Sequence, residues 1–260
     1  MNMQIGANVL YHVGKGIATV TLNRPQQYNT IDESLRNDLR NIFHAIRQND
    51  DIRAVILTGA GQNFSVGGDL LALEDMTPEA ATRQMEDVQD TAMAIATCER
   101  PVIAALEGRA ASAGLGLARL CDWIITGKES RFTLSYSRVG MGPEWGLSVT
   151  LPERVGRARA RKMVWDGVKL DARGALDLGL VDEICLPGQA MSAAWSMAEE
   201  LAEKPVQSVI STKCSFRVPP EELSLALENE VHRQTECLMS EDFIEGVYAI
   251  RQRRRPDFSR

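Results

Sequence analysis

The sequence contains no apolar run that approaches the ~18 residues needed to cross a membrane as a helix. Residues 1–13 also lack the basic region and the long apolar stretch that together mark a secretory signal. Both absences argue against a membrane-spanning or exported protein. We therefore expect a cytoplasmic protein with no membrane partner.

Side chains that commonly bind metals are few and scattered. The five cysteines form no CxxC pair and have no histidine at ligand spacing; they are Cys98, Cys121, Cys185, Cys214 and Cys237. In a chain of this size they are most simply interpreted as reduced thiols in the core. The three histidines, His12, His44 and His232, are isolated from one another. We therefore expect no metal site.

Nucleotide-binding motifs are absent as well. Neither the dinucleotide fingerprint GxGxxG nor the phosphate-binding GxxxxGK[ST] occurs. The formal net charge of −6 argues against a nucleic-acid partner. The basic run 251–255 (RQRRR) is an exception, and it is typical of a solvated helix end. We expect neither a nucleotide cofactor nor a nucleic-acid partner.

What is present is an ordinary globular composition, with 44% hydrophobic and 25% charged residues in 260. Short β-branched segments predict strands at 17–22, 54–58, 101–106, 122–126 and 131–134. A helix is predicted over 32–48, because apolar residues recur there at spacings of three and four after a candidate N-cap, Asp32. Strands that alternate with helices indicate a layered α/β core.

From about residue 152 the helical periodicity prevails, and no linker rich in Gly, Pro or Ser separates the two parts. We therefore expect an α/β core domain over residues 1–200 and a helical region over 201–260. Helices that extend beyond a core need a surface to pack on, either in their own chain or in another subunit.

Two glycine-rich segments, 61–70 and 107–118, each follow a predicted strand. Small residues allow the backbone to approach a ligand closely, and free N–H groups at a helix start favour negative charge. Two such turns could direct two N–H groups at one oxygen, as an oxyanion hole requires. Taken singly, each segment is more often a packing device.

Five segments stand out in order along the chain: LNRPQQYN, LTGAGQNFSVGGDL, PVIAALEGRAASAGLGLARLCD, FTLSYSRVGMGPEWG with LPERVGRARA, and EGVYAIRQRRRPDF. In order and spacing they match motifs of the crotonase (enoyl-CoA hydratase/isomerase) family, which the chain resembles over nearly its whole length. The resemblance implies an α/β spiral of ββα units with a helical C-terminal trimerisation region. It also implies a homotrimer or a hexamer made of two trimers. The expected substrate is an acyl-CoA thioester, whose coenzyme A is part of the substrate rather than a cofactor.

The resemblance places the two oxyanion-hole amides at Gly68 and Ala113, where they would hold the thioester oxygen as an enolate forms. The two glutamates of the family's hydratases would fall at Gly116 and Tyr136, and neither position has a carboxylate. A tyrosine with a pKa of about 10 is a poor base near neutrality. Hydration through a glutamate pair is therefore disfavoured.

Glu144 aligns where dienoyl-CoA isomerases, phenylacetyl-CoA ring-epoxide isomerases and aryl-CoA dehalogenases place an aspartate. A single carboxylate is enough to take a proton from one carbon and return it to another. Without the resemblance, a glutamate that follows Pro143 would be interpreted as a helix-start residue stabilised by the dipole.

The resemblance also assigns substrate-binding positions. Gln27 and Tyr28 fall in the loop that contacts coenzyme A, and Tyr136, at the position of the second hydratase glutamate, is a further substrate-binding position together with Gly68 and Ala113. Arg253 takes the place of a lysine on the last helix that meets the CoA phosphate, a role that an arginine can serve.

We expect isomerisation of an enoyl-CoA with Glu144 as acid and base, closest in motif to the ring isomerases of phenylacetate degradation. The enzymatic alternatives are a hydratase with relocated catalytic groups, and hydrolysis or dehalogenation with Glu144 as nucleophile. A silent acyl-CoA-binding protein is the alternative outside catalysis. An RNA-binding relative is disfavoured, because the predicted helix 32–48 contains no lysine.

Overall fold

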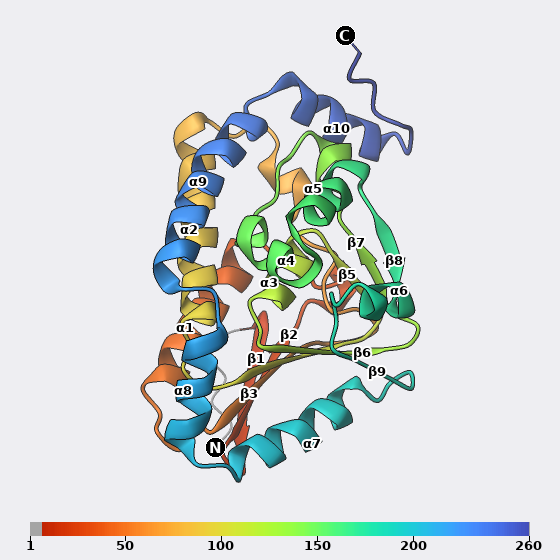
Figure 1. The fold of residues 1–260 in the computed structure, drawn as a ribbon. Helices are drawn as coiled ribbons and strands as arrows, with labels where there is room; N and C mark the ends of the chain where they lie inside the picture. Colours follow the sequence, from red (N-terminus) through yellow and green to blue (C-terminus); the bar gives the residue numbers. More distant parts are fainter. Residues whose placement is uncertain (1–6, 260) are drawn as a thin grey trace.

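The chain folds into two β-sheets covered by helices, as the computed structural model describes it for residues 7–259 (Figure 1). The larger sheet has six strands in the order β1-β2-β3-β4-β6-β9. Their bounds are β1 (Val9–Gly14), β2 (Ile17–Leu22), β3 (Ala54–Gly59), β4 (Val102–Leu106), β6 (Trp123–Gly127) and β9 (Glu183–Cys185). The β1–β2 pair is antiparallel and the other pairs are parallel, so crossover connections dominate the sheet.

The smaller sheet contains β5 (Arg109–Ala111), β7 (Arg131–Thr133) and β8 (Lys169–Asp171) in that spatial order. Two isolated parallel β-bridges also occur, one between Ser65 and Ala110 of β5 and one between Ile31 and Gly68. The chain therefore visits the large sheet and then the small one in successive turns, as in β4 followed by β5 and β6 followed by β7. This is the arrangement of a spiral of ββα units.

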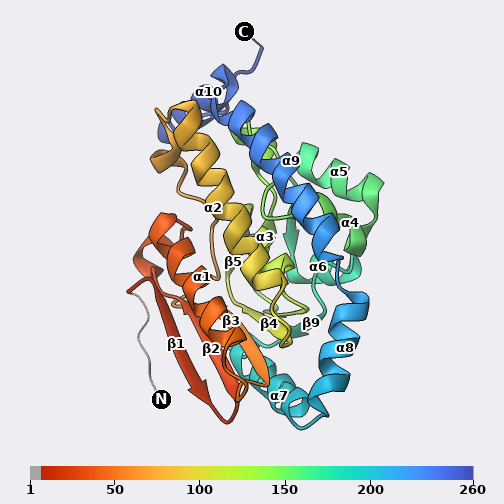
Figure 2. The ribbon, with the colours of Figure 1, turned by 90° about the vertical axis from the view of Figure 1, so that its left-hand side faces the viewer.

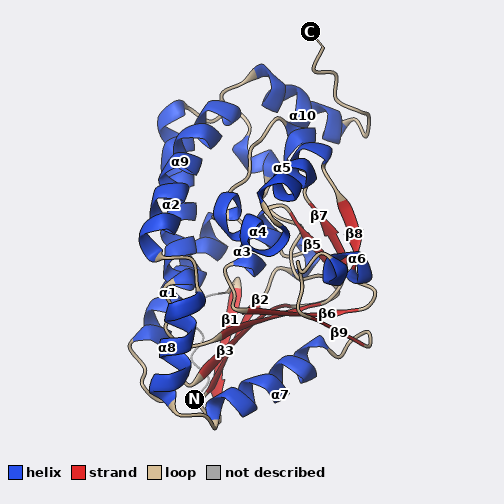
Figure 3. Cartoon of the chain, viewed as in Figure 1, coloured by secondary structure: helices blue, strands red, loops and turns tan. Residues whose placement is uncertain are grey.

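Helices surround both sheets (Figure 3). They are α1 (Glu33–Arg47), α2 (Pro78–Ala96), α3 (Ala113–Arg119), α4 (Leu147–Val155), α5 (Arg157–Asp166), α6 (Ala172–Asp177), α7 (Ala190–Ala202), α8 (Val206–Phe216), α9 (Pro220–Leu238) and α10 (Glu241–Arg251). Three short 3-10 helices are η1 (Pro25–Gln27), η2 (Leu70–Leu73) and η3 (Tyr136–Val139). Among the described residues, no helix is long and apolar enough to cross a membrane.

The large sheet is buried on both faces, as parallel sheets usually are. Successive side chains of a strand point to opposite faces, so Val55 and Leu57 of β3 enter the main core. Ile56 points the other way, into a second core that α7 closes with small side chains such as Ala194. Figure 1 shows α7 lying under the sheet, opposite the helices that face the main core.

The predicted strands are confirmed to within a residue at most ends, and β2 matches its predicted bounds. Helix α1 is confirmed together with its N-cap, since an Asp32 carboxylate oxygen accepts a hydrogen bond from the Leu35 N–H at 2.8 Å. The sequence analysis did not predict α2 or the strands β1, β5, β8 and β9.

The C-terminal helices fold back over their own chain. Helix α9 lies beside α2 in both views, and α10 packs against η3 (Figures 1 and 2). The predicted boundary between residues 200 and 201 falls in the last turn of α7, which belongs to the second core.

All five cysteines have free thiols. Cys98 and Cys121 are buried, in agreement with the prediction of core thiols, and Cys185 and Cys237 are partly buried. The prediction is wrong for Cys214, which is exposed because it lies on α8, a helix with no buried residue within this chain.

Candidate functional site

The two glycine-rich turns meet at a cavity of about 150 Å³. Gly68, Ala113, Tyr136 and Glu144 all line it, so the structure brings these four predicted site residues together. The remaining lining residues are Ile31, Arg36, Val66, Asp69, Leu70, Leu73, Gln84, Met85, Val88, Ala111, Ser112, Ser135, Val139, Met141, Trp145 and Ile250. Most of these side chains are apolar, as is usual for a pocket that binds an acyl group.

The first turn is held by hydrogen bonds to a neighbouring loop. The Ser65 hydroxyl donates to the Asn29 carbonyl at 2.7 Å and accepts from the Gly67 N–H at 3.2 Å. Gly67 has φ +100°, and a Cβ there would lie 2.9 Å from the Ala111 carbonyl oxygen, so glycine is required. Gly68 differs, because a Cβ on it would meet nothing within 4 Å. Open space therefore lies beside the Gly68 backbone.

The second turn runs from β5 into α3 through Ser112, which has φ +45°. It packs tightly on the first turn, since a Cβ on Gly114 would lie 2.6 Å from the Ser65 carbonyl oxygen. Within the described part of the chain, neither the Gly68 N–H nor the Ala113 N–H donates to a protein acceptor. Two residues with free amides therefore line one cavity, which an oxyanion hole requires.

Glu144 is a carboxyl group in a largely apolar environment. It is only 8% exposed, and no described residue forms a hydrogen bond or an ion pair with its side chain. Burial, and to a smaller extent the nearby Glu230 charge, raise its pKa from 4.5 to about 8, although the Arg36 charge opposes both. A carboxyl group with such a pKa can both take and return a proton near neutrality.

Arg36 places a positive charge on the wall of the same cavity. Its side chain is 1% exposed and comes from α1. It donates from Nη2 to Gln84 Oε1 at 2.6 Å and from Nε to the Asp87 carboxylate at 3.4 Å. Burial lowers the pKa of Arg36 and the Asp87 charge counteracts this. The guanidinium is therefore held in place by α2 rather than by Glu144.

Tyr136 is buried in η3, and the Glu144 backbone N–H approaches its hydroxyl without forming a well-aligned hydrogen bond. Burial raises the pKa of the phenol well above 10, as do the charges of Glu144 and Glu230, although the Glu144 backbone N–H partly offsets them. The phenol therefore stays protonated and cannot act as a base near neutrality.

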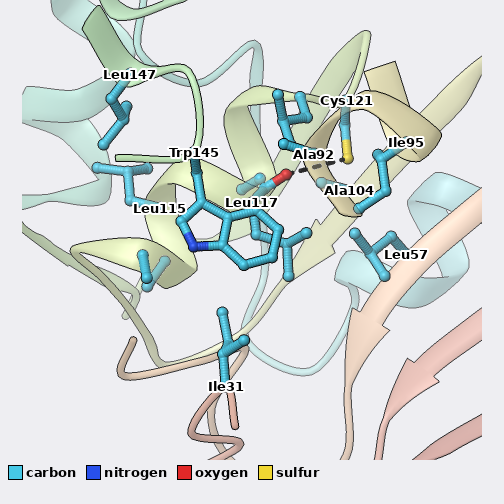
Figure 4. Packing of buried hydrophobic residues seen from close by; sticks show 14 of the residues in the cluster. Ile31, Leu57, Ala92, Ile95, Ala104, Leu115, Leu117, Cys121, Trp145 and Leu147 are labelled. Carbon is cyan, nitrogen blue, oxygen red and sulfur yellow. Dashed lines mark hydrogen bonds between the residues drawn. The ribbon is translucent and has the colours of Figure 1, made fainter. Parts of the chain in front are cut away.

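Gly116 holds the position expected for the first hydratase glutamate, and Trp145 and the Glu144 backbone occupy the space beside it. A Cβ on Gly116 would lie 2.7 Å from Trp145 Cβ and 3.3 Å from the Glu144 carbonyl oxygen. The indole of Trp145 is 1% exposed and packs among Ile31, Leu115 and Leu147 (Figure 4). No side chain larger than hydrogen fits at position 116 in this backbone.

The positions predicted to bind coenzyme A, Gln27, Tyr28 and Arg253, do not line the cavity. Gln27 ends η1, and Tyr28 follows it with 56% of its surface exposed. The Tyr28 carbonyl accepts a hydrogen bond from the Val66 N–H at 3.2 Å, so this loop adjoins the Gly68 turn. Arg253 is exposed and lies in the turn just beyond α10 rather than on it. The structure does not bring Arg253 to the cavity, although Ile250 of α10 reaches it.

Sequence reasoning missed Arg36 and two residues of α9, Glu230 and Gln234. The buried positions of α9 are Leu223, Leu227, Glu230, Gln234 and Leu238. Two polar side chains thus occupy the apolar stripe of an amphipathic helix. A polar side chain in such a stripe needs a buried hydrogen-bond partner. The two polar residues in the apolar stripe of α9 were therefore the sequence signal for a buried polar site.

Among the residues from 7 to 259, no group of three or more His, Cys, Asp or Glu side chains is arranged to hold a metal ion.

A family model described as enoyl-CoA hydratase/isomerase matches residues 12–260. The chain belongs to this family. A probable enoyl-CoA hydratase of Rhodobacter capsulatus is 34% identical over 257 residues, covering 96% of this chain and 97% of that protein. The 1,2-epoxyphenylacetyl-CoA isomerase of Escherichia coli is 30% identical over 256 residues, covering 96% of this chain and 98% of that protein.

A solved enoyl-CoA hydratase structure from Mycobacterium avium subsp. paratuberculosis is similar with a TM-score of 0.89 and 27% identity, over 98% of this chain and 100% of that one. The expected crotonase-like α/β fold is therefore confirmed. Hydratases and isomerases both occur among these members of the enoyl-CoA hydratase/isomerase family, so membership alone does not specify the reaction.

Proposed function

We propose that this member of the family isomerises the double bond of an enoyl-CoA thioester, with Glu144 as the acid and base. The supporting observation is the buried Glu144 carboxyl group beside two free amides, with position 116 closed to any second carboxylate. Asp69 also lines the cavity, but it is partly exposed and directly follows the oxyanion turn.

In the proposed reaction the thioester oxygen accepts hydrogen bonds from the Gly68 and Ala113 N–H groups. Each donor contributes on the order of 3 kcal/mol to stabilising the enolate. The ionised Glu144 carboxylate takes a proton from the α carbon of a 3-enoyl-CoA, and the electron pair delocalises into a dienolate. The same carboxyl group then returns the proton to the γ carbon, which leaves a 2-enoyl-CoA and an ionised Glu144.

Coenzyme A enters as part of the substrate in this proposal, and no separate cofactor takes part. Gln27 and Tyr28 bind the CoA portion, mostly through the backbone, and Tyr136 contacts the acyl group. Arg253 binds the CoA phosphate from the end of the C-terminal region, residues 201–260. The functional unit is a homotrimer or a hexamer.

The first prediction tests the base. Glu144→Gln keeps the shape of the side chain but cannot take a proton, so kcat should fall about 10²- to 10⁴-fold while substrate affinity changes little. The assay follows conversion of a 3-enoyl-CoA to its 2-enoyl isomer, together with deuterium uptake from solvent at the α and γ carbons. Glu129→Gln, on the exposed turn after β6, serves as the matched control.

Hydration is the second candidate, because the Rhodobacter capsulatus relative is named a probable enoyl-CoA hydratase. Water addition to a 2-enoyl-CoA should be measured beside isomerisation. Fast hydration without isomerisation would contradict the proposal, as would hydrolysis of the thioester. Binding of acyl-CoA without any turnover or deuterium uptake would instead indicate a silent acyl-CoA binder.

A further inference from the structure

Helix α9 reaches across to the turn that carries Glu144. Its Glu230 side chain accepts hydrogen bonds from the Gly146 N–H at 2.8 Å, the Ser148 N–H at 3.2 Å and the Ser148 hydroxyl at 2.6 Å. Both carboxylate oxygens accept from backbone N–H groups, so the ionised form of Glu230 fits this site. Burial nevertheless raises the pKa of Glu230, and the hydrogen bonds from Ser148 and Gly146 counteract this only in part.

One helical turn further on, Gln234 binds the other side of the same segment. Its Oε1 accepts from the Gly142 N–H at 2.9 Å, and its Nε2 donates to the Gly142 carbonyl at 2.9 Å. Residues 142 and 146 flank Glu144. The catalytic turn is therefore held from both ends by two side chains of one helix, spaced i and i+4.

The turn needs such external support. Trp145 has φ +61° and Gly146 has φ +70°, two successive residues in the left-handed region. For a bulky residue such as tryptophan this conformation costs on the order of 1–2 kcal/mol. A conformation of this kind persists only when surrounding contacts determine it.

We infer that Glu230 and Gln234 are positioning residues, which hold Glu144 in the cavity and, through the charge of Glu230, control the protonation of Glu144. The inference rests on the proposed role of Glu144 as base. Both residues belong to the C-terminal helical region, so the region expected to mediate assembly also shapes the active site of its own chain.

The charged groups that face Glu144 come from separate elements. Glu230 of α9 is negative, Arg36 of α1 is positive, and Tyr136 of η3 is neutral near pH 7. Asp69 lies further along the cavity wall. The Glu230 charge raises the pKa of Glu144 beyond the effect of burial, whereas Arg36 lowers it. Removal of the Glu230 charge should therefore make Glu144 a stronger acid.

The test compares Glu230→Gln and Gln234→Ala with the unmodified protein over pH 5.5 to 9. The base form of Glu144 starts the reaction, so kcat/KM should rise with pH through a limb set by its pKa. In Glu230→Gln this limb should move to lower pH, because the charge that raises the pKa of Glu144 is gone. The plateau should also fall at least tenfold, because the amide Nε2 would face a backbone N–H and loosen the turn.

Gln234→Ala separates positioning from charge. It removes two hydrogen bonds but no charge, so the plateau should fall while the pH limb stays in place. Glu236→Gln is the matched control, because Glu236 lies on the same helix with 65% of its side chain exposed, and it should change neither. Thermal unfolding of each variant establishes that it is folded.

The outcomes distinguish this inference from the proposed function. If Glu144→Gln retains full activity, the proposed function fails. If Glu144→Gln is inactive but Glu230→Gln keeps both the plateau and the limb of the unmodified protein, the inference is overturned. If Glu230→Gln does not fold, Gln234→Ala decides, and an unchanged plateau in that variant overturns the inference.

Discussion

At the scale of single residues, the burial of Glu144 links its proposed catalytic role to stability. Its pKa is about 8 in the folded chain, against an ordinary value of 4.5, because burial disfavours the charged form. Between these two pH values the folded chain holds a proton that the unfolded chain releases. The contribution of Glu144 to the free energy of unfolding is therefore largest below about pH 4.5 and is lost as pH rises toward about 8.

Glu144→Gln should remove this dependence. We expect the variant to be more stable than the unmodified protein at pH 8, by at least about 1 kcal/mol, and the two to converge at pH 5. Urea unfolding at pH 5, 6.5 and 8 measures the difference. Parallel pH dependences of the two proteins would show that Glu144 is ionised in the folded state throughout.

Ala113 supplies the second amide of the proposed oxyanion hole. Ala113→Val adds a branched side chain where the thioester oxygen should approach the N–H, so kcat/KM should fall more than tenfold, or at least about 1.4 kcal/mol. Ala202→Val, at the far end of α7, controls for the added bulk. A folded and fully active Ala113→Val would place the second amide elsewhere.

At the scale of elements, the sequence predicted those whose signal is local. Helix α1 has a long apolar stripe and an N-cap, and β2 is rich in β-branched residues. Strands β5 and β8 have three residues each, too few to show alternation, and they form only because a neighbouring strand pairs with them. Helix α2 was missed although Thr77 and Pro78 mark its start.

The candidate site likewise contains some residues that local motifs predict and others that only the tertiary structure reveals. Gly68, Ala113, Tyr136 and Glu144 were predicted through motifs, and all four line one cavity. Arg36, by contrast, acts on Glu144 through its charge, because the fold places both residues on one cavity although they are more than 100 residues apart in the sequence. No local pattern encodes such an arrangement.

The N-cap of α1 provides a prediction at this scale. The Asp32 side chain caps Leu35 and pairs with Arg24 at 2.8 Å. Asp32→Ala should therefore lower the free energy of unfolding by about 1 kcal/mol in chemical denaturation. Glu33→Ala, at an exposed neighbouring position, should have a smaller effect. Equal effects would show that the cap contributes nothing beyond the loss of charge.

At the scale of the whole molecule, the C-terminal helices expose apolar side chains. Large hydrophobic residues that are at least 47% exposed occur on α8, α9 and α10, namely Phe216, Leu225, Ile244, Tyr248 and Ile250. Exposed apolar surface of this kind marks association sites. We predict a homotrimer or hexamer, so light scattering should give three or six times the chain mass of 28.7 kDa. A monomer at micromolar concentration would contradict this.

The close contact between position 116 and the turn of Glu144 also restricts how such a site can evolve. A Cβ on Gly116 would lie 2.7 Å from Trp145 Cβ, so a glutamate at this position would clash with the turn of Glu144. A lineage with this turn cannot gain the hydratase glutamate by one tolerated substitution at position 116. The turn would have to change first, and that change would displace Glu144.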